Sequence, residues 1–251
     1  MKALASALAF LVMASAGAAS AAGKHRHFEP DDLELERPGI LDLDLQAGPM
    51  RGHSALGNHL VLPDFEVGLG LTRDVELDVS SAFTLDGQRH LSGEALWVAA
   101  KLGLLDARDA HGTAWAVGLE LGPRFPTFDA AGIGYGALAL IGFTRRGVAL
   151  VLNAGSLIDP GVTLSEEHPS SLVVGLDLNA QLDARGTWSL QSELGGAHYL
   201  SSDPAELACA LGATYAVNPK LDVSLTALSG FLRHGDRAGV LLGVSPQTAL
   251  W

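Results

Sequence analysis

The chain has 251 residues, 18% of them charged, and a mean hydropathy of +0.25. Its net charge of −12 argues against nucleic-acid binding, which needs a basic surface. The single cysteine, Cys209, excludes an internal disulfide. Beyond the N-terminus no apolar run approaches the roughly 18 residues that a transmembrane helix needs. High but dispersed apolar content suits a membrane β-barrel, in which only alternate residues meet lipid.

Residues 1–21 have the pattern of a secretory signal peptide. Lys2 precedes a short apolar core, and the small residues Ala19-Ser20-Ala21 provide a cleavage site after Ala21 or Ala22. A first membrane helix is the weaker interpretation because the core is short and rich in alanine. We therefore expect export, and we expect the charged residues 22–38 to form an N-terminal tail or a short plug.

Over residues 39–251, short segments of alternating apolar and polar residues follow one another, separated by clusters of Gly, Pro, Asp and Asn. No segment long enough to form a stable helix has helical periodicity. About twelve segments come near the length of roughly ten residues that is usual for a barrel strand. We expect strands near 40–46, 60–71, 74–84, 92–104, 113–122, 132–143, 147–156, 171–182, 187–198, 205–215, 220–231 and 238–246.

The connectors between these segments alternate between longer and shorter along the chain. The longer ones are AGPMRGHSALGNH, LDGQRH, GPRFPTFDAA, LIDPGVTLSEEHPS, YLSSDP and LRHGDR, and the shorter ones are TRD, DARDAHG, TRRG, DARG and AVNPK. Short periplasmic turns and longer outer loops are typical of outer-membrane barrels. An even number of strands places both termini on the periplasmic side. A soluble β-sandwich gives no reason for such sorting.

The segment EVGLGLTRDVELDV, Glu66 to Val79, shows how the side chains divide. It is either an ordinary soluble hairpin or a hairpin whose apolar face meets lipid. Side chains alternate between the faces of a strand, so Leu69, Leu71, Val75 and Leu77 share the lipid face of the second interpretation. The same alternation elsewhere predicts lumen-facing carboxylates opposed by few cations, chiefly Lys101. The carboxylates are Asp42, Asp44, Glu66, Glu76, Asp78, Glu120, Asp177, Glu193 and Asp222.

Aromatic residues fall on the apolar face near the ends of the expected strands. Four lie at the expected periplasmic ends: Trp115, Phe143, Trp188 and Tyr215; Phe83 and Phe231 lie at the opposite ends. Aromatic girdles at both interfaces are expected of a barrel in a bilayer. Aromatics also favour strands in general, but that preference does not explain why four share one rim. The sequence therefore predicts an all-β fold, a closed antiparallel transmembrane β-barrel of about twelve strands.

At the hairpin described above the chain resembles a family of outer-membrane proteins named for the meta-cleavage pathway of phenol degradation and often labelled as transporters. The resemblance lies in Gly70-Leu71-Thr72 followed by Glu76-Leu77, in the strand–turn–strand ATYAVNPKLDVSLTAL, and in LELGPRFPT. It covers residues 60–231 and rests on degenerate motifs. It implies a barrel in the outer membrane and passage of small organic molecules, with no catalytic residues to carry over.

The C-terminus departs from the usual outer-membrane pattern, which ends in an aromatic residue on a clean strand. The chain ends in Trp251, but Pro246 and Gln247 interrupt the run. Because proline cannot donate to a β-ladder, we expect the closing strand to stop near Ser245.

The functional hypothesis is a passive channel or transporter for small solutes, aromatic or otherwise apolar ones among them. An acidic lumen attracts cations and repels anions. The alternative is a structural or adhesive barrel with a filled interior and no transport. Gly134, Gly136 and Gly142 on the inward face either leave room for a solute or permit tight curvature. Expected partners are outer-membrane lipid, a small-molecule solute and the barrel-assembly machinery, with no nucleic acid and no cofactor.

Enzymatic activity is a third hypothesis, which we do not favour. His198 lies near Ser201 and Ser202, and His53 adjoins Ser54, but the spacing is not diagnostic and no G-x-S-x-G elbow is present. We expect no enzymatic activity.

No metal site is expected either. The pair His25 and His27 lacks a third ligand. Cys209, between Leu207 and Leu211, is expected on the lipid face as a small apolar residue.

Overall fold

A computed structural model of the chain describes residues 35–52, 57–108, 113–127, 132–160, 170–200, 205–232 and 235–251. The predicted signal peptide and residues 22–34 of the predicted tail lie outside the described residues. Within the described ranges, no helix is long and apolar enough to cross a membrane.

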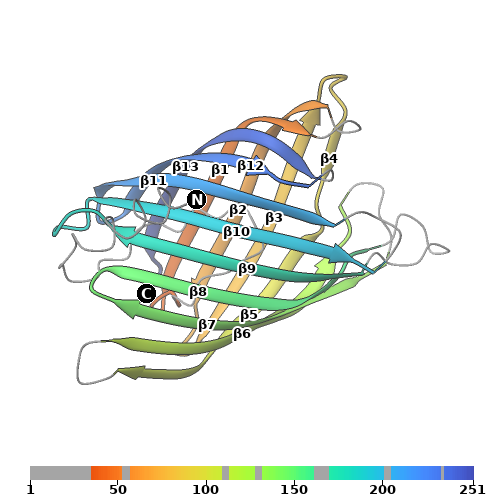
Figure 1. Ribbon diagram of the computed structural model, residues 1–251. Coiled ribbons are helices and arrows are strands. Elements are labelled where there is room, and N and C mark those ends of the chain that lie inside the picture. The colour runs from red at the N-terminus through yellow and green to blue at the C-terminus, as the bar shows by residue number, and fades with distance from the viewer. Residues whose placement is uncertain are drawn as a thin grey trace, which may run out of the picture.

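Strands make up the described fold, and each of the expected strands is present (Figure 1). They are β1 (Ile40–Gly52), β2 (Asn58–Gly70), β3 (Val75–Asp86), β4 (Leu91–Gly93), β5 (Leu96–Arg108), β6 (Ala114–Phe125), β7 (Gly134–Arg145), β8 (Val148–Ile158), β9 (Ser170–Gln181), β10 (Trp188–Tyr199), β11 (Glu206–Asn218), β12 (Leu221–Gly230) and β13 (Asp236–Ala249). Only β4 was not expected; it is a short strand that pairs with the end of β3.

Twelve of these strands close into a ring in which every neighbouring pair is antiparallel. With β4 left aside, strands that follow one another in sequence pair, so β3 pairs with β5, and β1 pairs with both β2 and β13. The β1–β13 ladder joins the two ends of the chain and leaves no free edge in the ring, which removes the exposed edges of an open sheet. The predicted fold class is confirmed.

The two ends of the barrel carry different links. At one end, called the short-turn end, strands are joined over 71–74, 109–113, 146–147, 182–187 and 219–220; at the other, called the long-link end, over 53–57, 87–95, 126–133, 159–169, 200–205 and 231–235. The start of β1 and the end of β13 both lie at the short-turn end. There the N–H of Gly39 donates to the carbonyl of Gly70 and that of Leu250 to the carbonyl of Gly39.

The turn over 182–187 shows how local polar groups hold the short-turn end. The carboxylate of Asp183 accepts the backbone N–H of Trp188 at 2.8 Å and that of Arg185 at 3.3 Å. The bond from Trp188 is the main reason that the pKa of Asp183 lies below its ordinary value.

The expected stop near Ser245 is wrong, because β13 continues through Pro246 to Ala249. Proline has no N–H to donate, and the β1–β13 ladder indeed skips the positions of Ser245 and Pro246. Pairing resumes at Gln247, whose N–H also donates to the carbonyl of Lys220 at 2.9 Å. The ladders on both sides therefore carry the strand past the missing donor.

The first strand is also longer than expected. We expected it to end at residue 46, but β1 continues through Pro49 to Gly52. Both neighbouring strands pair with this extension, and Met50 packs inside the barrel in a buried cluster with Val61, Leu228 and Leu241. Tertiary pairing here outweighs the turn preference of the Gly-Pro sequence.

The outer surface is an apolar belt. Exposed outward residues alternate with buried inward ones along the strands, as in β7 and β13, and in β12 the exposed Leu225 lies between the buried Ser224 and Thr226. The outward residues Leu121, Ile141, Leu152, Leu172, Val174, Leu211, Leu225, Val240 and Leu242 are between 41% and 61% exposed. An extended apolar surface of this kind marks contact with lipid or protein, and an outward apolar band is what a membrane barrel presents to lipid.

Aromatic pairs line the short-turn rim of this belt. Trp115 and Phe143 contact edge to face with ring centroids 4.9 Å apart, and Trp188 and Tyr215 lie 4.8 Å apart. Each pair is directly opposite in the β-ladder. The grouping that the sequence predicts at this rim is therefore present in the fold.

Candidate solute site inside the barrel

Polar side chains fill much of the inward face, and the predicted lumen residues are among them. Those less than 9% exposed are Asp42, Asp44, Glu76, Asp78, Lys101, Glu120, Asp177 and Glu193, whereas Glu66 and Asp222 are half-buried. The neighbours of the buried ones in sequence are more exposed than they are, so the period of two places these side chains inward.

A cavity of about 470 Å³ occupies the long-link half of the lumen. Of the predicted residues, Asp44, Glu66, Asp78 and Glu120 line it. The other six, Asp42, Glu76, Lys101, Asp177, Glu193 and Asp222, do not. The structure therefore buries or half-buries all ten predicted residues, and four of the ten line this cavity.

Sequence reasoning missed several residues of the cavity. Trp97, Arg124 and Tyr199 line it, together with the carboxylates Asp64, Glu94, Asp159 and Glu206. The alternation that places Lys101 inward also places Trp97 inward, so that signal was present. Arg124 was assigned to a connector, but β6 continues to Phe125 and carries it into the lumen.

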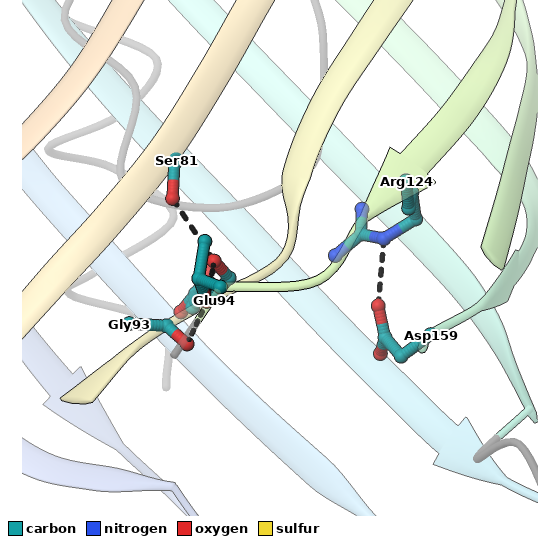
Figure 2. Close-up of polar contacts among 6 residues, drawn as sticks. Ser81, Gly93, Glu94, Arg124 and Asp159 are labelled. Atoms are coloured by element: carbon teal, nitrogen blue, oxygen red, sulfur yellow. Dashed lines mark hydrogen bonds and ion pairs between the residues drawn. The ribbon is translucent and has the colours of Figure 1, made fainter. Parts of the chain in front are cut away.

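Arg124 is held on one side of the cavity by an ion pair and by an aromatic ring (Figure 2). Its Nε donates to Oδ1 of Asp159 at 2.6 Å. Its guanidinium carbon lies 5.6 Å from the ring centroid of Trp97, within the range of a cation–π contact. The positive charge of Arg124 is therefore already shared between a carboxylate and an aromatic face.

Glu94 lies apart from the Arg124–Asp159 ion pair, and Ser81 points toward Glu94 (Figure 2). The Ser81 hydroxyl donates to the carbonyl of Glu94 at 3.0 Å, and the Thr127 hydroxyl lies 2.8 Å from the carbonyls of Gly93 and Glu94. These contacts fix the backbone of the link between β4 and β5. Elsewhere on the wall, the Tyr199 hydroxyl donates to Oε1 of Glu206 at 3.0 Å.

The short-turn half of the lumen is closely packed. Lys101 and Glu76 are each 1% exposed and Glu193 is 2% exposed. The chain segment before β1 also enters here: the N–H of Glu36 donates to Oε2 of Glu76, and Nε2 of Gln247 donates to Oε2 of Glu36 at 3.1 Å. A side chain at Gly70 would overlap the carbonyls of Glu36 and Arg37, so the glycine makes room for this segment.

The three glycines predicted to face inward are all buried on β7. A Cβ at Gly136 would lie 2.8 Å from Cζ2 of Trp97, whereas one at Gly134 would overlap the carbonyl of Ile158. Gly136 thus accommodates the indole, and Gly134 permits the close approach of β7 and β8. The space beside Gly136 is occupied by Trp97 and not by open lumen.

Replacing Gly136 by alanine should destabilise the barrel by about 1–3 kcal/mol, since the new methyl group must displace the Trp97 ring. Denaturant unfolding in detergent, followed by the mobility shift between folded and unfolded chain, measures this. Gly87→Ala is the control, because its Cβ would meet only the Asn58 carbonyl at 3.8 Å. Equal stability of the two variants would contradict the assignment.

Of the candidate catalytic and metal-ligating residues, only His198 lies in the part of the chain that the structure describes. His198 is exposed and opposite Leu172 in the ladder, on the outer face, while Tyr199 beside it points inward. His25, His27, His53, Ser54, Ser201 and Ser202 lie outside the described residues. In the parts of the chain that the structure describes, no three His, Cys, Asp or Glu residues are arranged to hold a metal ion. Cys209 is half-buried and opposite Leu194 on the outer face.

A closed antiparallel barrel with an apolar outer belt, aromatic pairs at one rim and a polar interior defines a class of protein, the transmembrane β-barrels of the outer-membrane type.

Solved structures agree with this class, although no family model and no curated protein sequence matches the chain. The NanC porin is similar over 82% of this chain and 98% of its own, with a TM-score of 0.57 and 9% identity. Outer membrane phospholipase A from Escherichia coli is similar over 90% of this chain and 95% of its own, with a TM-score of 0.51 and 10% identity. The CymD monoaromatic hydrocarbon channel matches over 85% and 89%, with a TM-score of 0.42 and 10% identity. At such identities the likeness shows the fold alone.

Proposed function

We propose that this protein is a passive channel for small solutes in a bacterial outer membrane. The observation that carries the proposal is the cavity of about 470 Å³, lined by charged and apolar side chains, in the long-link half of a closed barrel. No energy-coupling motif is visible in the sequence, so transport would run down a gradient. The NanC porin, whose name states a pore, supports a channel role for this fold.

The charge of the cavity favours cations. Eight carboxylates line it, and Arg124 is the one basic residue among its described lining residues. Low-dielectric walls strengthen the field of such a surface, and rings of acidic side chains are a known basis of cation selectivity. We therefore propose that cations and neutral molecules enter more readily than anions.

The orientation and the partners follow from the same proposal. The signal peptide over residues 1–21 would direct export, the barrel-assembly machinery would insert the chain, and lipid would cover the apolar belt. The short-turn end would face the periplasm and the long-link end the cell exterior, as in other barrels of this class. The resemblance to the phenol meta-pathway family supports passage of small organic molecules.

Purified, refolded protein in a planar lipid bilayer should show discrete conductance steps. In a gradient of potassium chloride, the reversal potential should have the sign of a cation-selective pore, because the lumen is acidic. Asp44→Asn combined with Glu66→Gln should lower the cation preference without abolishing conductance. A folded preparation that gives neither conductance nor solute flux into vesicles would contradict the channel.

A structural barrel with a filled interior is the second candidate, and one observation favours it. The short-turn half of the lumen holds almost fully buried side chains, among them Lys101 and Glu193, and the segment at Glu36 packs against Glu76. That packing predicts no ion passage, so the bilayer measurement separates the two candidates. We also propose that the chain is not an enzyme; lipid hydrolysis that disappears in His198→Ala and Ser201→Ala would contradict this.

A further inference from the structure

Two buried polar groups belong to residues that line the cavity and make no hydrogen bond of ordinary geometry among the described residues. They are both carboxylate oxygens of Asp78, which is 4% exposed, and Nε1 of Trp97, which is 5% exposed. Buried polar groups are rarely left unpaired, and exceptions often mark a place where a ligand or water supplies the partner. Asp78, whose carboxyl also interacts with that of Glu76, and Trp97 thus bring an acceptor and a donor to the wall of the cavity.

The acceptor lies on a carboxylate-rich part of the wall. Asp78 on β3 is next to Glu66 of β2, and both line the cavity. The positive charge of Lys101 attracts the Asp78 carboxylate. Lys101 is, however, directly opposite Glu76 and Glu120 in the two ladders of β5, so its charge is shared with those two carboxylates. Arg124 is engaged by Asp159 at 2.6 Å. The charges on this wall therefore favour a positively charged occupant.

The rest of the cavity favours an organic cation over a metal ion. In the described ranges no three His, Cys, Asp or Glu side chains are placed so that they could hold a metal ion together. One side of the cavity is apolar, formed by Trp97, Leu157, Val173 and Ala197 from a buried cluster inside the barrel. A volume of about 470 Å³ falls within the usual range of roughly 300–1,000 Å³ for small-molecule sites.

We propose that this cavity binds a small organic cation, an ammonium group on an apolar body. The ammonium group donates to Asp78, with Glu66 beside it, and the apolar body packs against Leu157 and Val173. This inference rests on the proposed function in one respect, since it names the class of solute that the channel would accept.

Isothermal titration of the full-length protein in detergent tests the proposal with three matched probes: 2-phenylethylammonium, 2-phenylethanol and phenylacetate. We expect the ammonium compound to bind about tenfold or more tightly than the neutral alcohol, as a charged hydrogen bond allows, and phenylacetate not to bind. Equal affinity of the alcohol and the ammonium compound, or tighter binding of phenylacetate, would overturn the inference.

Variants locate the site. Asp78→Asn should weaken binding of the ammonium compound about tenfold, and Glu66→Gln, at a half-buried position that tolerates substitution, should weaken it by a smaller factor. Asp106→Asn is the control, because it removes the same charge from an exposed position away from the cavity. Gel mobility confirms that each variant is folded. Unchanged affinity in both folded cavity variants would overturn the proposal.

Tryptophan fluorescence gives a second readout. Trp115, Trp188 and Trp251 are 48–70% exposed, whereas Trp97 lines the cavity. The ammonium compound should change the emission of the native protein but not that of Trp97→Phe. Binding of the ammonium compound without conductance would support this inference and refute the channel. Conductance without a preference for the ammonium compound would support the channel and refute this inference.

Discussion

Replacing Lys101 by methionine should lower the free energy of unfolding by about 3–5 kcal/mol, the usual cost of removing one partner from buried opposite charges. Lys101 is 1% exposed and lies directly opposite Glu76 on one neighbouring strand and Glu120 on the other. Those two carboxylates are 1% and 5% exposed. Without the ammonium group between them, two negative charges remain buried in close proximity. Denaturant titration of the folded barrel in detergent measures the loss.

Two further variants separate charge from packing. Lys220→Met makes the same exchange in the exposed turn at 219–220 and should leave stability nearly unchanged. Lys101→Met combined with Glu120→Gln should recover part of the loss, because one uncompensated charge is then gone. A Lys101→Met barrel as stable as the native one would show that water, and not Lys101, balances these carboxylates.

The strands and their faces were predictable because the pattern that determines them is local. Apolar side chains that recur at every second position indicate which face of a strand a residue takes, and carboxylates assigned to the opposite face in this way, such as Asp42 and Glu193, are buried in the structure. The predictions that failed concern Pro49 and Pro246. Both prolines lie inside strands, where ladders from two neighbours outweigh the local preference for a turn.

The cavity itself was not predictable in the same way. Which inward residues share one level of the barrel depends on the register between strands, and Arg124 pairs with Asp159 across 35 positions of sequence. Inward apolar residues such as Leu138 and Leu157 were also missed, because β7 and β8 are apolar on both faces and alternation then carries no signal. The acidic character of the lumen could therefore be predicted from the sequence. The level of each residue along the barrel and the apolar side of the cavity could be seen only in the structure.

An arginine in place of Leu225 should destabilise the barrel by about 2–4 kcal/mol in a lipid bilayer, the cost of a basic side chain at the midplane of a membrane strand. Leu225 is central in β12, points outward and is 57% exposed. In water an exposed side chain of this kind would tolerate the exchange within about 0.5 kcal/mol. The penalty arises only if hydrocarbon surrounds the belt. Reversible folding into vesicles, followed by denaturant titration, measures it.

Leu200→Arg is the matched control for depth. Leu200 is 61% exposed, as much as Leu225, but it follows the last residue of β10 at the long-link end. There the same charge should cost no more than about 1 kcal/mol, because the side chain reaches the headgroup region and water. The difference between the two variants reports the bilayer directly, since burial within the protein is the same for both. Equal and small effects at the two positions would mean that lipid does not cover the belt, and the barrel would then have to be placed in another environment.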